Sequence, residues 1–181
     1  MKSFRRNLLL ATPELLDTNF CRAVILILEH QNEGAIGVVL NRPTDHYSVD
    51  VMPKWNQCLD SDPRLYWGGP VQEESLLALA LSADPHGDAS DETIFLIEVL
   101  NLNQELLDTA NLLSTRLYSG YAGWSAGQLD TEISTGGWIV ADSDDSDPFT
   151  EDPDALWGSI LSRQTGFIST LSQYPDDPRM N

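Results

Sequence analysis

Basic residues are scarce in this sequence of 181 residues, which has 10 Lys and Arg against 28 Asp and Glu and a net charge of −18. Proteins that bind nucleic acids neutralise phosphates with clustered cations. The densest basic group here is the short N-terminal set Lys2, Arg5 and Arg6. Direct binding of DNA or RNA is therefore disfavoured, and the acidic charge is best interpreted as a solvated surface.

Cysteine and histidine are also rare. The two cysteines, Cys21 and Cys58, lie in different segments and form no CxxC pair. We therefore expect two free thiols in a reducing compartment rather than a disulfide. The three histidines, His30, His46 and His86, have no second His or Cys at a ligand spacing, so the sequence predicts no zinc site.

Long apolar runs are missing as well. No segment approaches the ~20 apolar residues that span a bilayer, and Leu8–Ala11 is too short for the apolar region of a signal peptide. We expect a cytoplasmic protein without membrane association. Hydrophobic residues make up 41% of the chain, enough for a core at this length. No linker or repeat divides the sequence, so we expect one domain over residues 1–173 and an extended tail over 174–181.

Strand patterns dominate what is present. The expected strands are Leu8–Ala11, Phe20–His30, Ala35–Leu40, Arg64–Trp67, Ser75–Leu81, Thr93–Val99, Arg116–Ala122 and Trp138–Ala141. Helical patterns occupy Ser48–Asp60 weakly, Gln104–Leu113, the segment after Ser125 and the segment after Asp152-Pro153. The continuous apolar run Ala23–Leu28 indicates a strand that is buried on both faces. Hairpins mixed with helices predict an α+β fold with a mixed sheet.

The clearest local motif surrounds Ser125. Ser125 and Gln128 have capping-box spacing, which predicts Ser125 as a helix N-cap, and Gly136-Gly137 ends that helix. Gly123–Gly127 also matches the G-x-S-x-G pattern of a nucleophile elbow. An α/β-hydrolase places its catalytic histidine after the serine, whereas all three histidines precede Ser125. Ser125, with His30 as its base, is therefore only a weak catalytic candidate.

Metal and cofactor motifs are not evident. The acidic stretch between Asp142 and Asp154 places Asp147 where a calcium loop needs glycine and Pro153 where it needs glutamate. A solvated loop is expected, with weak cation binding as the alternative. The sequence has no P-loop and no GxGxxG motif, so no cofactor is predicted.

Two tryptophans, Trp67 and Trp124, border glycine-rich turns. Glycine allows a backbone to come close either to another strand or to a ligand. Close backbone packing is the first interpretation, and a ligand or partner groove is the second. Such a groove would comprise Asn41, Arg42, Trp67, Gly68, Gly69, Gly123, Trp124 and Gln128. Arg42 and the N–H groups at the start of the Gln128 helix would suit an anion.

Four stretches taken together carry a family resemblance. They are Leu8–Pro13, Glu29-His30 with Gly34–Pro43, Gly68–Val71 and Gly120–Leu129. In this order they resemble the bacterial YqgE/AlgH family. The resemblance implies a compact α+β fold in which a curved sheet forms a partial barrel with helices around it. It also implies a label of transcriptional regulator, but no catalytic residues. The sequence departs from the family pattern at Asp130, where Glu is usual, and at Asn7, where glycine is common.

The leading functional hypothesis is a non-enzymatic regulatory or interaction module that binds a protein or a small anionic ligand. The alternatives are a nucleic-acid-binding transcriptional regulator and an esterase-like hydrolase that uses Ser125. The groove hypothesis requires the glycine-flanked turns to lie around one concavity.

Overall fold

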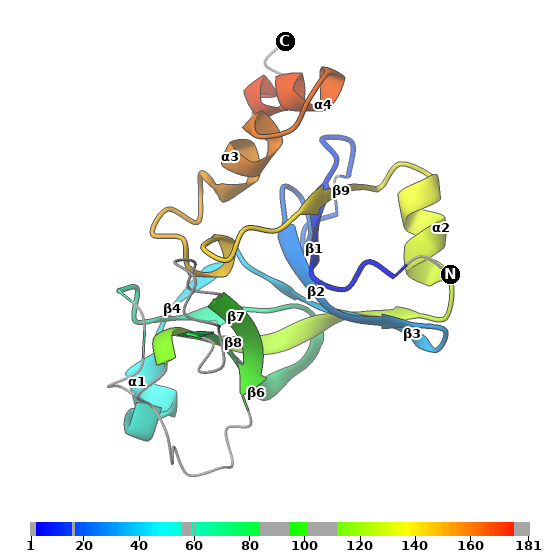
Figure 1. Ribbon diagram of the computed structural model, residues 1–181. Coiled ribbons are helices and arrows are strands. Elements are labelled where there is room, and N and C mark those ends of the chain that lie inside the picture. The colour runs from blue at the N-terminus through cyan, green and yellow to red at the C-terminus, as the bar shows by residue number, and fades with distance from the viewer. Residues whose placement is uncertain are drawn as a thin grey trace.

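The computed structural model describes residues 3–15, 17–55, 59, 61–83, 95–100 and 112–175 (Figure 1). Its strands are β1 (Asn7–Ala11), β2 (Val24–Gln31), β3 (Gly34–Val39), β4 (Pro43–Tyr47), β5 (Arg64–Trp67), β6 (Val71–Ala83), β7 (Phe95–Leu100), β8 (Leu112–Ser125) and β9 (Trp138–Asp142). Its helices are α1 (Ser48–Val51), α2 (Gln128–Ser134), α3 (Leu156–Ser162) and α4 (Phe167–Thr170), with 3-10 turns η1 (Pro53–Trp55), η2 (Asp147–Phe149) and η3 (Leu171–Gln173). None of the described helices is long and apolar enough to cross a membrane.

The nine strands form one mixed sheet with the order β4-β5-β8-β3-β2-β1-β9, and β6 joins β7 to β8. The β5–β8 pair is parallel, whereas the other pairs are antiparallel. Among the described strands the path ends at β4 and β9, so the curved sheet does not close into a barrel (Figure 1). The predicted single-domain α+β fold with a partial barrel is confirmed.

The centre of the sheet is buried on both faces. Along β1 and β2, successive side chains alternate between two core clusters, as the two-residue period of a strand requires. Leu8 and Leu26 face the core beneath α3, and Leu9 and Ile25 face the core beside α2. This arrangement explains the continuous apolar run in the sequence and confirms the predicted burial on both faces.

The connection from β5 to β6 crosses β8 with almost no space between the two backbones. A Cβ atom on Gly68 or Gly69 would overlap the backbone of Gly120 or Tyr121, respectively. Gly69 and Gly120 also have positive φ angles of 148° and 70°. Glycine is required at this crossing on both counts, which confirms close backbone packing as the role of the Gly68-Gly69 turn.

The N-termini of two helices differ from the predictions. Ser125 is the last residue of β8, and α2 has Gly127 as its N-cap, with φ of 71° and no side-chain capping bond. The prediction of Ser125 as an N-cap is therefore wrong, because β8 runs on to Ser125 in its pairing with β3. Helix α3 begins at Leu156 rather than directly after Pro153, although Asp152 Oδ1 accepts a hydrogen bond from the Ala155 N–H at 3.1 Å.

Several predictions fall on residues outside the described ranges. The predicted helix at Gln104–Leu113 is described only at Leu112 and Leu113, which belong to β8. Cys58, His86 and residues 176–181 of the tail also lie outside. Tyr174, at the start of that tail, packs against the core beneath α3, and its carbonyl oxygen accepts a hydrogen bond from Arg22 at 2.6 Å.

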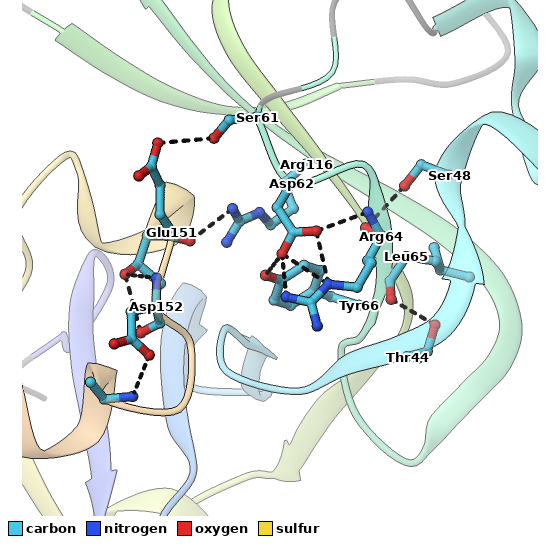
Figure 2. A network of polar contacts seen from close by, with 12 residues as sticks. Thr44, Ser48, Ser61, Asp62, Arg64, Leu65, Tyr66, Arg116, Glu151 and Asp152 are labelled. Carbon is cyan, nitrogen blue, oxygen red and sulfur yellow. Dashed lines mark hydrogen bonds and ion pairs between the residues drawn. The ribbon is translucent and has the colours of Figure 1, made fainter.

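A polar network fastens β5 and β8 to the loop around η2 (Figure 2). Asp62 accepts hydrogen bonds from the Arg64 guanidinium at 2.7 Å and from the Tyr66 hydroxyl at 2.6 Å. The buried Arg116 lies over the Tyr66 ring and donates to the Thr150 carbonyl oxygen at 2.9 Å. These hydrogen bonds and the contact between Arg116 and the Tyr66 ring join β5, β8 and the loop after η2, which assigns the network a structural role.

Candidate functional site

Asn41 and Arg42, two residues of the predicted groove, support the backbone instead. The buried Asn41 amide accepts from the Val24 N–H and donates to the Arg22 carbonyl oxygen, both at 2.9 Å. The Arg42 guanidinium donates to the carbonyl oxygens of Asn41 and Cys21. Burial lowers the pKa of Arg42 below its usual value. These side chains therefore serve the turns that flank β2 and β3.

The other members of the predicted groove divide into two groups. Trp67 is half-buried and donates its indole N–H to Glu73 at 3.0 Å. Gly68 and Gly69 lie at the backbone crossing, packed against Gly120 and Tyr121. Gly123, Trp124 and Gln128, in contrast, line a common cleft. The structure thus brings together the residues at the end of β8 and the start of α2, but does not add Asn41, Arg42, Trp67, Gly68 or Gly69 to the lining.

We call this space the aromatic cleft. It has a volume of about 450 Å³ and lies between the end of β8, helix α2, the start of β9 and the segment before β2. Its lining residues are Leu15, Asp17, Phe20, Pro70, Ala122, Gly123, Trp124, Gln128, Glu132, Thr135, Gly137 and Trp138. The walls are the edge-to-face pair Trp124–Trp138, with ring centroids 6.2 Å apart, and Phe20, whose ring lies 5.7 Å from that of Trp138.

Glu132 organises the polar side of the aromatic cleft. Its Oε2 accepts the indole N–H of Trp124 at 2.9 Å and that of Trp138 at 2.8 Å. Its Oε1 accepts from the Gln128 amide at 2.8 Å. One carboxylate thus fixes both indoles and the Gln128 side chain, so the cleft is formed before any ligand arrives. Asp17 adds a second carboxylate to the lining. Because two carboxylates repel a negative charge, the aromatic cleft is unsuited to an anion.

A second hollow, the sheet-face hollow, lies on the other side of the same stretch of β8. It has a volume of about 500 Å³ and is lined by Glu29, Gln31, Glu33, Gly34, Ala35, Ile36, Val71, Tyr121, Gly123 and Trp124. Ile36 is 40% exposed there, and Glu29 and Glu33 are both exposed. Gly123 and Trp124 therefore line hollows on both sides of the end of β8.

The Ser125 hydroxyl has a local partner. It donates to Gln128 Oε1 at 3.0 Å, and the same oxygen accepts the Ser125 N–H at 3.0 Å. The two nitrogens of buried His30 face other groups, with Nδ1 accepting from the Phe4 N–H at 3.2 Å and Nε2 lying 3.4 Å from Asp130 Oδ2. Within the described ranges Ser125 bonds to no histidine, so the geometry gives no support to a nucleophile–base pair.

Several residues of the aromatic cleft were missed by the sequence-based prediction. These are Phe20, Trp138, Glu132 and Asp17. A partial signal existed, because Glu132 follows Gln128 by one helical turn and so shares its face. No local pattern connects Phe20 or Trp138 with Trp124. Across the described residues, no cluster of three or more His, Cys, Asp or Glu side chains is arranged to hold a metal ion.

Comparison with known proteins identifies the family to which this chain belongs. The AlgH-like family profile matches residues 8–169. The chain belongs to the AlgH-like family. A UPF0301 protein of Streptomyces coelicolor is 38% identical over 192 residues, which cover 100% of this chain and 97% of the relative. The resemblance recognised from the glycine motifs is thereby confirmed.

Two solved structures share the fold. The crystal structure of protein DIP2367 from Corynebacterium diphtheriae superimposes with a TM-score of 0.82 at 29% identity, covering 95% of this chain and 92% of that one. The solution structure of the AlgH protein from Pseudomonas aeruginosa gives 0.67 at 26% identity, covering 97% and 96%. The architecture is thus that of the AlgH-like family along nearly the whole chain.

Proposed function

We propose that this AlgH-like chain is a protein-interaction module whose partner inserts an apolar or aromatic side chain into the aromatic cleft. The observation that carries the proposal is the convergence of Trp124, Trp138 and Phe20 around one open space of about 450 Å³. That volume lies within the range of roughly 300–1,000 Å³ that is typical of ligand sites.

The preformed walls support this function. Because Glu132 already holds Trp124 and Trp138 through their indole N–H groups, neither ring must lose further side-chain freedom when a ligand binds. Ordering an unrestrained side chain at an interface costs about 0.5–1.5 kcal/mol. Tryptophan is also one of the residue types enriched among the few residues that dominate binding energy at protein interfaces.

The small anionic ligand of the sequence-based hypothesis has weaker support. Asp17 and Glu132 place two carboxylates in the lining, whereas Arg42, the expected anion partner, donates to backbone carbonyl groups. Direct nucleic-acid binding faces the same obstacle together with a net charge of −18. We expect no binding of a fluorescent duplex in an anisotropy titration at low salt. Salt-sensitive micromolar binding would favour the nucleic-acid function instead.

Site-specific photo-crosslinking in cells of the source organism tests the proposal. A photoreactive residue replaces Thr135, which is exposed at the cleft, and the matched control carries it at Thr165, also exposed but absent from the lining. We expect a protein adduct from position 135, lost when Gln128→Ala and Asp17→Lys are added. An adduct pattern identical at both positions, or one that ignores the cleft substitutions, would refute the function.

A further inference from the structure

Gly123 is a glycine that the fold itself does not need. A Cβ atom there would lie 3.6 Å from the Tyr121 ring and 3.7 Å from Val71, which are ordinary contacts, and Gly123 is not among the glycines with positive φ. Gly34, Gly68, Gly69 and Gly120 differ, because a Cβ atom on any of them would overlap backbone. Glycine inside a strand costs about 0.5–1 kcal/mol relative to alanine, and it often marks the approach of another backbone or a ligand.

The backbone of Gly123 lies on an edge of β8 that is unpaired among the described strands. At residues 122–125 one edge of β8 pairs with β3, and no described strand pairs with the other edge there. The Ser125 N–H bonds to the Gln128 side chain rather than joining the ladder. Since backbone groups alternate between the two edges of a strand, the N–H and C=O of Gly123 also point away from β3.

The two hollows flank this edge. Gly123 and Trp124 line both of them. As successive residues of a strand, they face opposite sides of the sheet. An added strand would place the residue opposite Trp124 at the aromatic cleft and its neighbour, opposite Gly123, over the sheet-face hollow. The position of the hollows on opposite sides of this edge thus matches the alternation of successive side chains along an extended chain.

We infer that the partner docks by strand addition: an extended segment of a partner protein pairs with β8 at Gly123 and sends adjacent side chains into the two hollows. This inference rests on the proposed function and names the form of its ligand. Main-chain hydrogen bonds supply affinity in such complexes, and pockets for alternate side chains supply specificity.

Charge selects the residue over the sheet-face hollow. Glu29 and Glu33 lie at that hollow beside the exposed Ile36, and the whole chain carries a net charge of −18. A lysine or arginine fits this lining, because its aliphatic stem covers Ile36 while its charged end reaches a carboxylate. The partner segment therefore carries an apolar or aromatic residue next to a basic one.

A phage-displayed library of linear peptides provides the probe. We expect selected sequences to place Lys or Arg next to an aromatic or large apolar residue. In a synthetic peptide taken from the selection, N-methylation along the backbone should abolish binding at alternate positions only. A helical ligand would not give this two-residue period. If N-methylation showed no such period, strand addition would be overturned.

Variants of the protein supply the second arm. Gly123→Leu fills the sheet-face hollow and should abolish peptide binding, whereas Gly123→Ala should weaken it less, with circular dichroism confirming that both variants fold. Glu29→Gln with Glu33→Gln should weaken binding about fivefold at low salt, and Glu74→Gln, at an exposed position of β6, should not. Unchanged binding by Gly123→Leu would overturn the inference.

The two proposals can fail separately. A protein adduct at Thr135 combined with peptides that show no two-residue period would leave the interaction module standing and remove strand addition. The absence of both an adduct and a selectable peptide would remove both.

Discussion

Gly69 lies against the Tyr121 peptide so closely that a Cβ atom on Gly69 would overlap the Tyr121 carbonyl group. This contact carries the chain from β5 over β8 into β6, and so it sets the position of the β8 segment that ends at the aromatic cleft. The glycine motif and the candidate site are therefore linked through the backbone rather than through a shared ligand.

Substitution at this crossing should be severe. We expect Gly69→Ala to lower the free energy of unfolding by more than about 3 kcal/mol, since the methyl group meets backbone that cannot give way. Gly127→Ala is the matched control, because Gly127 has φ of 71° but nothing within 4 Å of its Cβ position, and it should cost only about 1–2 kcal/mol. Urea titrations of both variants measure the difference; equal losses would contradict the steric argument.

Asn41 should behave as a structural residue. Asn41→Leu removes the acceptor of the buried Val24 N–H, and an unsatisfied buried group costs about 1–3 kcal/mol. A fall in the free energy of unfolding of at least that size is expected from chemical denaturation. Asn19→Leu, at an exposed position, should stay within about 0.5 kcal/mol of the parent.

Glu132 should control the two indoles of the aromatic cleft. Glu132→Ala removes the acceptor for the Trp124 and Trp138 N–H groups, so both indole resonances should shift in ¹H–¹⁵N spectra, while that of Trp157, which bonds to the Ala11 carbonyl oxygen, should not. Glu132→Gln retains one acceptor oxygen and should shift them less. Unmoved Trp124 and Trp138 resonances in the alanine variant would mean that the carboxylate does not hold the cleft.

Stability should fall in acid through Asp62. Hydrogen bonds from Arg64 and Tyr66 hold the pKa of Asp62 well below its usual value of 3.8. A carboxylate with a lowered folded-state pKa contributes stability above its unfolded-state pKa, and this contribution is lost as the pH falls from about 4 toward the folded-state value. Asp62→Asn should therefore reduce the pH dependence of the free energy of unfolding below pH 4. Asp45→Asn, at an exposed site, should leave that pH dependence unchanged.

Ser125 should be dispensable for stability and for ester turnover. Its exposed hydroxyl bonds only to Gln128 in the described structure, so Ser125→Ala should change the free energy of unfolding by less than about 0.5 kcal/mol. Turnover of a panel of activated esters should be the same for the parent and the variant. A serine-dependent rate would revive the hydrolase hypothesis.

Local patterns in the sequence predicted much of the fold, with limits that have a physical cause. The apolar run of β2 and the glycines after α2 influence only residues close to them in the chain. Strand and helix ends could therefore be located from these local patterns. The N-cap assignment of Ser125 failed because pairing with β3 extends β8, an interaction between residues about 90 positions apart. β4 was missed for the same reason, since Pro43 gains strand geometry only by pairing with β5.

The sequence by itself determined the mixed α+β architecture, the buried central strands, the acidic charge and membership of the AlgH-like family. Only the tertiary structure decided which glycines serve packing and which one lies at an edge of β8 that no described strand pairs with. It also decided that Phe20, Trp124 and Trp138 share one cleft while Arg42 lies outside its lining. Periodicity and turn chemistry act between neighbours in the chain, whereas a cleft is made by side chains that meet only after distant strands have paired.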